Sequence, residues 1–153
     1  MAKRKRENLR KNIQFQIKDF SSIYTNQIFE ILKENFENPW SKKLINSSCK
    51  ISKVVLKENK VLAYICVDFV FDEAEIHMIA VKKQLQNSGI GSFLLKEILN
   101  ILKRKNVKKV FLEVNENNKI AICFYKKFGF KEIFKRKKYY KNKYDAIIME
   151  LIL

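Results

Sequence analysis

The hydrophobic positions of this chain follow two periods, and each period predicts one kind of element. Apolar residues that alternate with polar ones, or form short continuous runs, predict strands. Such runs occupy residues 13–17, 51–56, 61–71, 75–81, 107–114, 133 onward and 146–153. Apolar residues three or four positions apart predict amphipathic helices. They occupy residues 21–36, 41–47, 90–102 and 118–128.

Helix-ending and helix-starting residues agree with these boundaries. Asp19 or Ser21 can cap the first helix, Pro39 ends it, and Ser41 can cap the short helix that follows. Gly129 follows the last helix, where a left-handed residue commonly closes a helix. The apolar face expected of that last helix consists of Ile120, Ala121, Phe124 and Phe128.

The predicted order, β-α-α-β-β-β-α-β-α-β-β, indicates the α/β class. A meander of strands comes before strand–helix–strand units, so we expect a mixed sheet with helices on both faces. We expect a single domain at residues 13–153, after a flexible basic arm at residues 1–12.

The charge of the chain favours an anionic partner. Among 153 residues, 32 are lysine or arginine and 16 are aspartate or glutamate, which gives a net charge of +16. A nucleic acid, a ribosomal surface and an anionic cofactor such as coenzyme A are all compatible with this charge. Codon usage that enriches lysine is a further explanation, and composition alone does not choose between them.

The remaining composition limits the chemistry. No run of about 18 apolar residues predicts a membrane span, and no secretory signal is expected. The three cysteines, Cys49, Cys66 and Cys123, show no C-x-x-C spacing, and we expect reduced core thiols in a cytoplasmic protein. His77 is the only histidine, so no metal site is expected.

A glycine-containing segment between a predicted strand and a predicted helix is the main candidate for chemistry. It consists of Gln86, Asn87, Ser88, Gly89, Ile90, Gly91 and Ser92. Glycine permits a tight turn, and the first N–H groups of a helix lack internal acceptors at the positive end of its dipole. The segment therefore predicts a phosphate-binding loop, although a plain helix start is the alternative. It matches neither the Walker A loop nor G-x-G-x-x-G.

The pattern Q-x-x-G-x-G resembles the R/Q-x-x-G-x-G/A loop of the GNAT acetyltransferases, which bind acetyl-CoA. The resemblance covers most of the chain, because the element order and a second motif agree with it. That motif, L-E-V…N-x-x-A…Y-x-x-x-G-F, is matched at residues 111–114, 117–118, 121–125 and 128–130. The fold that this resemblance implies is the GNAT fold, a mostly antiparallel twisted sheet.

Two further segments are similar to one GNAT subfamily. Residues 38–41 read N-P-W-S, and residues 136–140 read R-K-K-Y-Y before Asp145-Ala146 and Met149. Both resemble the bacterial RimI enzymes, which acetylate the N-terminal alanine of small-subunit ribosomal protein eighteen. The acceptor implied by the resemblance is therefore a protein N-terminus.

The resemblance also implies roles for individual residues. The backbone of Ile79, Ala80 and Val81 would pair with the pantetheine arm of the cofactor like an added strand. Residues 87–92 would hold the pyrophosphate with Gln86 beside it, and Asn118 would contact coenzyme A. Glu113 matches the general base and Tyr125 the general acid.

The chemistry of amine acetylation requires such groups independently. An α-amine has a pKa of ~7.7–8.0 and is mostly protonated at neutral pH. A carboxylate within reach can remove that proton, and a backbone N–H near Ile79 or Val81 could stabilise the oxyanion. A phenol could protonate the leaving thiolate, and no metal is needed.

Each of these side chains also has a structural alternative. Glu113 lies between Leu112 and Val114 and could form a half-buried ion pair, whereas Tyr125 could be a core residue. Trp40 and Tyr139 are expected to line the acceptor site. Trp40 could equally be a buried anchor, and Tyr139 could stack on RNA.

The sequence thus predicts a cytoplasmic protein N-terminal acetyltransferase that uses acetyl-CoA and acts on a ribosomal protein. A GNAT enzyme acting on a lysine, a polyamine or a small-molecule amine is the alternative within the class. A basic RNA- or ribosome-binding protein without enzymatic activity is the alternative outside it.

Overall fold

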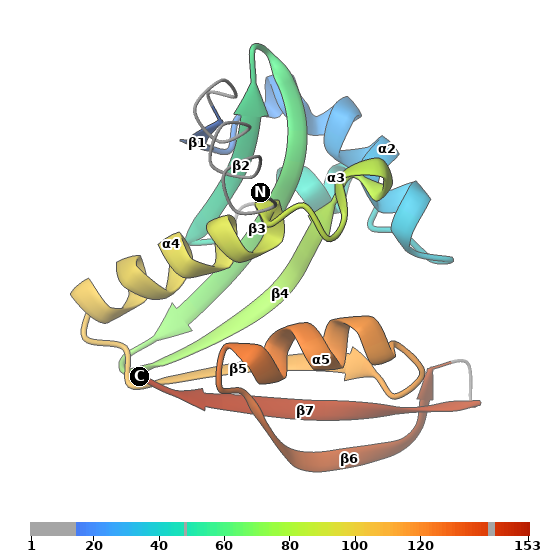
Figure 1. Ribbon diagram of the computed structural model, residues 1–153, viewed down its shortest axis with the longest axis vertical. Coiled ribbons are helices and arrows are strands. Elements are labelled where there is room, and N and C mark those ends of the chain that lie inside the picture. Colours follow the sequence, from blue (N-terminus) through green and yellow to red (C-terminus); the bar gives the residue numbers. More distant parts are fainter. Residues whose placement is uncertain (1–14, 48, 141–142) are drawn as a thin grey trace, which may run out of the picture. The chain divides into compact units, whose positions relative to one another are not determined.

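The computed structural model describes residues 15–47, 49–140 and 143–153, and the predicted basic arm lies outside them. Seven strands and four α-helices follow one another along this part of the chain in the predicted order (Figure 1). The helical elements are η1 (Ser22–Tyr24), α2 (Thr25–Asn35), α3 (Lys42–Asn46), η2 (Lys83–Leu85), α4 (Ile90–Arg104) and α5 (Lys119–Lys127). The strands are β1 (Gln16–Asp19), β2 (Ile51–Lys57), β3 (Lys60–Val70), β4 (Glu73–Val81), β5 (Lys109–Asn115), β6 (Lys131–Tyr140) and β7 (Tyr144–Ile152).

The strands form one mixed sheet in the order β1-β2-β3-β4-β5-β7-β6. The pairs β1–β2, β5–β7 and β6–β7 are antiparallel, whereas β4 and β5 are parallel, as expected for strands joined by the crossover helix α4. A mixed, mostly antiparallel sheet is therefore confirmed. The chain divides into two compact units, Met1–Cys66 with Met78–Lys96 and Val67–His77 with Glu97–Leu153, which are described separately. The prediction of a single domain at residues 13–153 stays a prediction.

The first unit is built around an apolar core between helices and strands. Helices α2 and α3 contribute their buried faces, and β2, β3 and the end of β4 contribute theirs. The members are Ile28, Ile31, Leu32, Ile45, Val54, Leu56, Val61, Tyr64, Cys66 and Ala80. Ser41 caps α3 by accepting a hydrogen bond from the Leu44 amide at 3.2 Å, as predicted.

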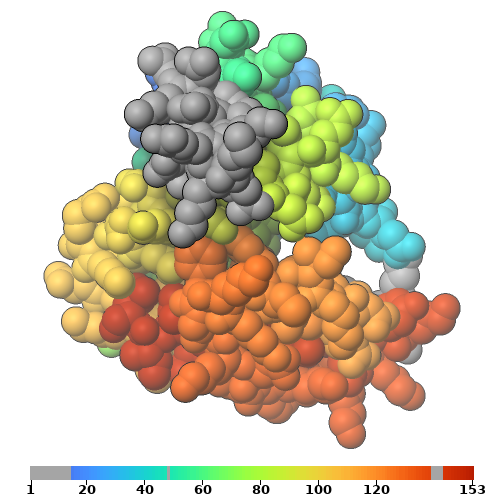
Figure 2. All heavy atoms as spheres, in the orientation of Figure 1, coloured from blue at the N-terminus to red at the C-terminus, as the bar shows by residue number. Residues whose placement is uncertain are grey.

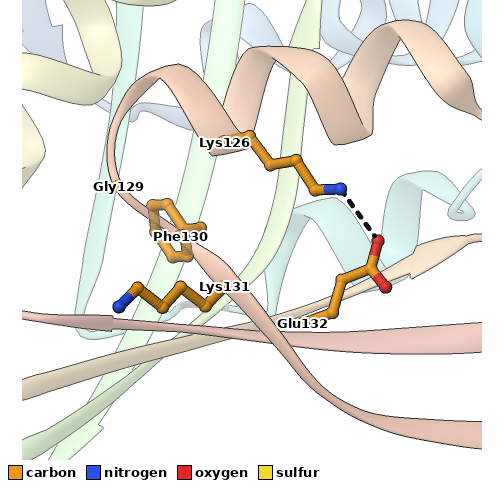
Figure 3. Close-up of a pocket in the computed structure, with 5 residues that line it drawn as sticks. All are labelled: Lys126, Gly129, Phe130, Lys131 and Glu132. Atoms are coloured by element: carbon orange, nitrogen blue, oxygen red, sulfur yellow. Dashed lines mark ion pairs between the residues drawn. The ribbon is translucent and has the colours of Figure 1, made fainter.

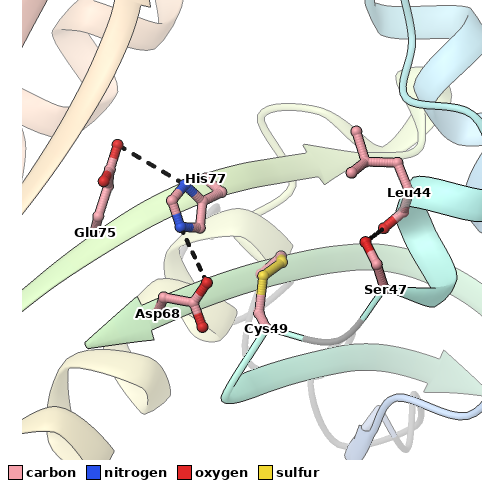
Figure 4. The surroundings of a disulfide bond; sticks show 7 residues. Leu44, Ser47, Cys49, Asp68, Glu75 and His77 are labelled. Carbon is pink, nitrogen blue, oxygen red and sulfur yellow. Dashed lines mark hydrogen bonds and ion pairs between the residues drawn. A yellow bond between two sulfur atoms is a disulfide. The ribbon is translucent and has the colours of Figure 1, made fainter. Parts of the chain in front are cut away.

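A disulfide joins Cys49 to Cys66 in this unit (Figure 4). Their Cα atoms are 5.7 Å apart, a separation that a disulfide can bridge. The expectation of reduced core thiols is therefore wrong for this pair, and Cys123 is exposed on α5 rather than buried. The spacing of the cysteines in the sequence did not show that Cys49, before β2, lies beside Cys66 in the buried part of β3.

The second unit packs α5 against β5, β6 and β7. The ring of Tyr125 lies edge-on to Phe130, with centroids 5.7 Å apart, and Ile122, three positions earlier on the same helix, is also buried. Gly129 has φ +96 just after α5, and a Cβ there would lie 3.3 Å from Leu151 Cδ1. The predicted glycine closure of this helix is therefore confirmed, and the turn leads directly into β6.

The buried face of α5 differs from the predicted one. Ile120 is 73% exposed, whereas Ile122 and Tyr125 are buried. A helix of nine residues is short enough for two overlapping apolar stripes to fit the same sequence. Contact with Phe130 selects the stripe that contains Tyr125, and the outer face of α5 lies on the surface shown in orange in Figure 2.

In the part of the chain that the structure describes, no helix is both long enough and apolar enough to cross a membrane.

Candidate active site

The segment at residues 86–92 forms a turn that leads into α4, as predicted. Asn87 has φ 62 and Gly89 has φ 92, so two residues of the segment adopt left-handed backbone conformations. The first backbone hydrogen bond of α4 runs from the Phe93 amide to the Gly89 carbonyl at 2.9 Å. The amides of Ile90, Gly91 and Ser92 precede it and therefore have no earlier helical turn to donate to.

This arrangement fits a phosphate group. Alternating left-handed residues bring successive N–H groups into a concave nest, and the N-terminus of α4 adds its dipole. A Cβ at Gly89 would meet no heavy atom within 4 Å among the described residues, so the space in front of the turn is open. The side chain and the backbone amide of Ser88 both turn back to the Leu85 carbonyl, so the amides of Ile90, Gly91 and Ser92 are the ones left for a ligand.

The last residues of β4 present an edge next to this loop. The parallel pairing with β5 covers Glu73–Lys109 to Ile76–Leu112, so among the described residues Ile79, Ala80 and Val81 lie beyond it. The side chain of Ala80 is buried in the core of the first unit, whereas Ile79 and Val81 are half-buried. An unpaired strand edge offers N–H and C=O groups to an extended ligand.

Gln86 has a structural role that sequence reasoning missed. Its side-chain amide donates to Asn35 Oδ1 on α2 and, at 3.4 Å, to the Val81 carbonyl. Asn35 Nδ2 donates to the same carbonyl at 3.0 Å. The end of β4 and the start of the loop are therefore fastened to α2. The Val81 carbonyl already has two donors, so the edge groups that a ligand can use lie before it.

Glu113 lies on β5 with its side chain 26% exposed, next to an arginine from another strand. Arg136 Nη2 on β6 is 3.1 Å from Glu113 Oε1. In the sheet, Asn115 pairs with Ala146 and Ala146 with Arg136, whereas Glu113 pairs with Ile148. Arg136 thus reaches diagonally across β7, where the small Ala146 side chain leaves room.

This ion pair orients the carboxylate without enclosing it. Because Arg136 contacts Oε1, the second oxygen of Glu113 is the one left for a proton. The neighbouring pair of Lys135 and Glu116, with 3.4 Å between nitrogen and oxygen, has a similar exposure, but its lysine lies one residue earlier in β6. Sequence reasoning noticed Arg136 only as part of a motif, and no local pattern shows that it pairs with Glu113.

Asn118 and Tyr125 lie at the start and in the middle of α5. Asn118 is the N-cap of this helix, and its Oδ1 accepts a hydrogen bond from the Ala121 amide at 3.1 Å. Its Nδ2 group is the part left for a ligand. Tyr125 is 7% exposed, and its ring contacts those of Phe124 and Phe130. The ring of Tyr125 is therefore a core residue, as the structural alternative predicted.

The two residues expected at the acceptor site lie in different surroundings. Trp40 follows α2 and is half-buried against the core of the first unit, which fits an anchor. Tyr139 belongs to the end of β6, and its side chain lies outside the described part of the structure.

Two other groups of side chains are candidates for an alternative site. A shallow hollow of about 430 Å³ at the α5–β6 turn is lined by Gly129, Phe130 and Lys131 and is crossed by the ion pair of Lys126 and Glu132 (Figure 3). It is open, and that ion pair already uses its carboxylate.

His77 places its two nitrogens 3.2 Å from Asp68 and 3.8 Å from Glu75, on opposite sides of the ring (Figure 4). The His77, Asp68 and Glu75 side chains therefore do not converge on a point where a metal could bind. Within the described ranges, no group of three or more His, Cys, Asp or Glu side chains is arranged to hold a metal.

The loop, the strand edge and the order of elements agree with a known family. The acetyltransferase (GNAT) family model matches residues 25–130 of this chain. The chain belongs to the GNAT acetyltransferase family. The predicted GNAT fold and enzyme class are confirmed, and as a GNAT enzyme it is an acyltransferase with acetyl-CoA as its acetyl donor.

Relatives of this GNAT enzyme include bacterial modifiers of a ribosomal protein. The [ribosomal protein bS18]-alanine N-acetyltransferase of Escherichia coli strain K12 is 35% identical over 119 residues, which cover 74% of this chain and 80% of that protein. The enzyme of the same name from Haemophilus ducreyi is 30% identical over 135 residues, which cover 84% and 93%. The crystal structure of the Escherichia coli ribosomal-protein-S18-alanine N-acetyltransferase has a TM-score of 0.85 at 29% identity and covers 91% of this chain and 94% of that one. The predicted resemblance to the RimI enzymes is thereby confirmed.

Proposed function

We propose that this GNAT enzyme transfers the acetyl group of acetyl-CoA to the α-amine of a protein N-terminus, and that the acceptor is a ribosomal protein of the bS18 type. The bS18-alanine N-acetyltransferases named above, with up to 35% identity over most of their length, support this acceptor. The observation that carries the proposal within the structure is Glu113, a half-buried carboxylate held at one oxygen by Arg136. We also propose that the reaction takes place in the cytoplasm.

We propose that the first unit supplies the donor site. The loop at residues 87–92 would bind the pyrophosphate, chiefly through the amides of Ile90, Gly91 and Ser92, because it combines a nest with a helix N-terminus. The edge groups of Ile79 and Ala80 would pair with the pantetheine arm as an added strand. Gln86, in this proposal, acts through Asn35 by fixing the loop rather than by contacting phosphate. Asn118, which matches the family asparagine that contacts coenzyme A, would donate to the cofactor through its Nδ2 group.

The chemical step needs a base, an oxyanion donor and an acid. Acetyl-CoA supplies the acetyl group as a reactive thioester. Glu113 would take one proton from the α-ammonium group, directly or through a water, and so free the amine lone pair for attack on the carbonyl carbon. An amide of the β4 edge would donate to the oxyanion that develops.

The leaving sulfur needs a proton as the bond to carbon breaks, and Tyr125 would donate it. The phenol would regain a proton from the second one that the nitrogen loses as it becomes the amide. Its ring is fixed between Phe124 and Phe130, so the hydroxyl would be delivered in one direction. Trp40 and Tyr139 remain the candidates for contact with the acceptor chain. Direct attack needs no covalent enzyme intermediate.

Mass spectrometry of two peptides tests this proposal. One peptide begins with a free Ala-Arg N-terminus and contains internal lysines, and the other has the same sequence with a blocked N-terminus. Acetylation of the free α-amine alone is the expected result. Acetylation of lysine in both peptides would instead favour the alternative acceptor class, and binding of acetyl-CoA without transfer to either would indicate a small-molecule amine.

A further inference from the structure

The turn between β3 and β4 breaks a strong local preference. Only two residues, Phe71 and Asp72, connect Val70 at the end of β3 to Glu73 at the start of β4. Phe71 has φ 53, in the left-handed region that glycine and asparagine normally occupy in such short turns. A bulky residue in this conformation is an outlier, because its Cβ crowds the backbone.

The phenylalanine gains no burial in exchange for this conformation. Its side chain is 91% exposed, the highest exposure of any large hydrophobic residue that the structure describes. The neighbouring Val70 is also largely exposed. Strained backbone conformations that persist without a packing reason concentrate at functional sites. The turn therefore leaves an aromatic ring open to solvent on a strained backbone.

The turn is held rigidly beside a basic segment of the same unit. The Asp72 carbonyl accepts hydrogen bonds from the amides of Lys108 and Lys109 at 2.6 and 3.1 Å, and the Lys108 carbonyl accepts one from the Leu153 amide at 2.8 Å. Figure 1 shows the β3–β4 turn, the connection from α4 to β5 and the C-terminus meeting at this point. The ring of Phe71 is thus presented on a fixed backbone rather than on a loose loop.

Exposed cations occupy the last turn of α4 and the segment that follows it, whose backbone hydrogen-bonds to the β3–β4 turn. They are Lys103, Arg104, Lys105, Lys108 and Lys109. We call these five residues with Phe71 the turn patch. Lys103 and Arg104 have a structural explanation at the C-terminal end of a helix, and Arg104 also lies 3.7 Å from Glu97.

Lys105, Lys108 and Lys109 follow α4, so the dipole at the end of that helix does not explain them as residues of its last turn. Lys105 lies 5.6 Å above the ring of Phe69, and Lys108 and Lys109 form no ion pair within the described ranges. The nearby acids are Asp72 in the turn, Glu73 at the start of β4 and Glu97 beside Arg104, so five cations against three carboxylates leave the turn patch with an excess of positive charge.

We propose that the turn patch binds single-stranded RNA. A planar ring on the surface stacks on an unpaired base, and lysines around it contact the phosphates that flank that base. Duplexes keep their bases stacked internally, whereas RNA loops and bulges offer them for stacking. A membrane surface fits less well, because interfacial binding uses the long apolar face of an amphipathic helix and not a two-residue turn. The proposal does not rest on the acetyltransferase activity.

Fluorescence anisotropy of a labelled oligouridylate with the full chain tests the proposal. Phe71→Asn keeps a residue suited to a left-handed conformation but removes the ring, and we expect it to weaken binding by about fivefold or more. The double variant Lys108→Gln/Lys109→Gln is expected to weaken binding and to reduce the salt dependence, log Kd against log salt, by about 1.4.

Matched controls remove the same groups elsewhere in the second unit. Phe134→Asn removes another exposed ring, and Lys127→Gln/Lys131→Gln removes two charges at the α5–β6 turn; neither should change the affinity. Phe71→Asn should also unfold at the same or a higher temperature than the wild type, which separates lost binding from lost folding.

Equal weakening by the control variants, or wild-type affinity in Phe71→Asn, would overturn the proposal. Binding to anionic lipid vesicles without binding to the oligouridylate would also overturn it.

Discussion

Replacing Gly89 by alanine tests whether the turn before α4 is a cofactor loop. Gly89 has φ +92, and a Cβ added there would meet nothing within 4 Å among the described residues. The cost of the substitution is therefore confined to the backbone, at about 1–2 kcal/mol for a left-handed non-glycine residue. The alanine variant escapes this cost by changing the conformation of the turn.

If acetyl-CoA requires the observed conformation, its affinity should fall by about five- to thirtyfold. Isothermal titration calorimetry with acetyl-CoA, at a temperature at which both proteins are folded, measures this change. Gly129→Ala is the matched control, because Gly129 also has a positive φ of +96 but closes α5. It should lower the free energy of unfolding and leave the affinity for acetyl-CoA unchanged. Wild-type affinity in Gly89→Ala, or an equal loss in both variants, would refute the reasoning.

Three further predictions concern the core, the sheet and the disulfide. Burial raises the pKa of the Tyr64 phenol and a hydrogen bond with Ser52 lowers it in part, so the native state should lose stability as pH rises above about 10, where the unfolded chain ionises first. In urea unfolding, the free energy of unfolding should fall less steeply with pH in Tyr64→Phe than in the wild type. Parallel curves for the two proteins would contradict this. Arg136→Gln should lower kcat with KM for acetyl-CoA unchanged, and Arg136→Lys should restore part of the rate. Lys135→Gln should leave kcat and KM unchanged. Equal effects of Arg136→Gln and Lys135→Gln in steady-state kinetics would show that Arg136 has no positioning role. Reduction of the Cys49–Cys66 bond should lower the free energy of unfolding by about 3 kcal/mol for this loop length, and unchanged denaturant midpoints with and without dithiothreitol would rule that out.

Local signals in the sequence predicted most elements of the fold. Ser41 caps α3 and Gly129 closes α5 because capping depends only on neighbouring residues. The glycine turn before α4 was predicted for the same reason. The β3–β4 turn was misplaced by one residue, since Phe71 reads as part of an apolar strand but has a left-handed conformation.

Contacts between distant residues were not predictable in this way. Gln86 reaches Asn35 across 51 positions of the chain, and Arg136 reaches Glu113 because β6 and β5 both pair with β7. These partners depend on strand order and register, which hydrophobic period alone does not specify.

The rate of acetyl transfer by Glu113→Gln tests the central claim most directly. Single-turnover transfer from acetyl-CoA to a peptide with a free N-terminal alanine should slow by ~10²–10⁴-fold, because the amide cannot accept the proton. The affinity for acetyl-CoA should not change. Glu132→Gln, which removes a carboxylate paired with Lys126 at the α5–β6 turn, should transfer at the wild-type rate. A wild-type rate in Glu113→Gln would contradict the assignment of Glu113 as the general base.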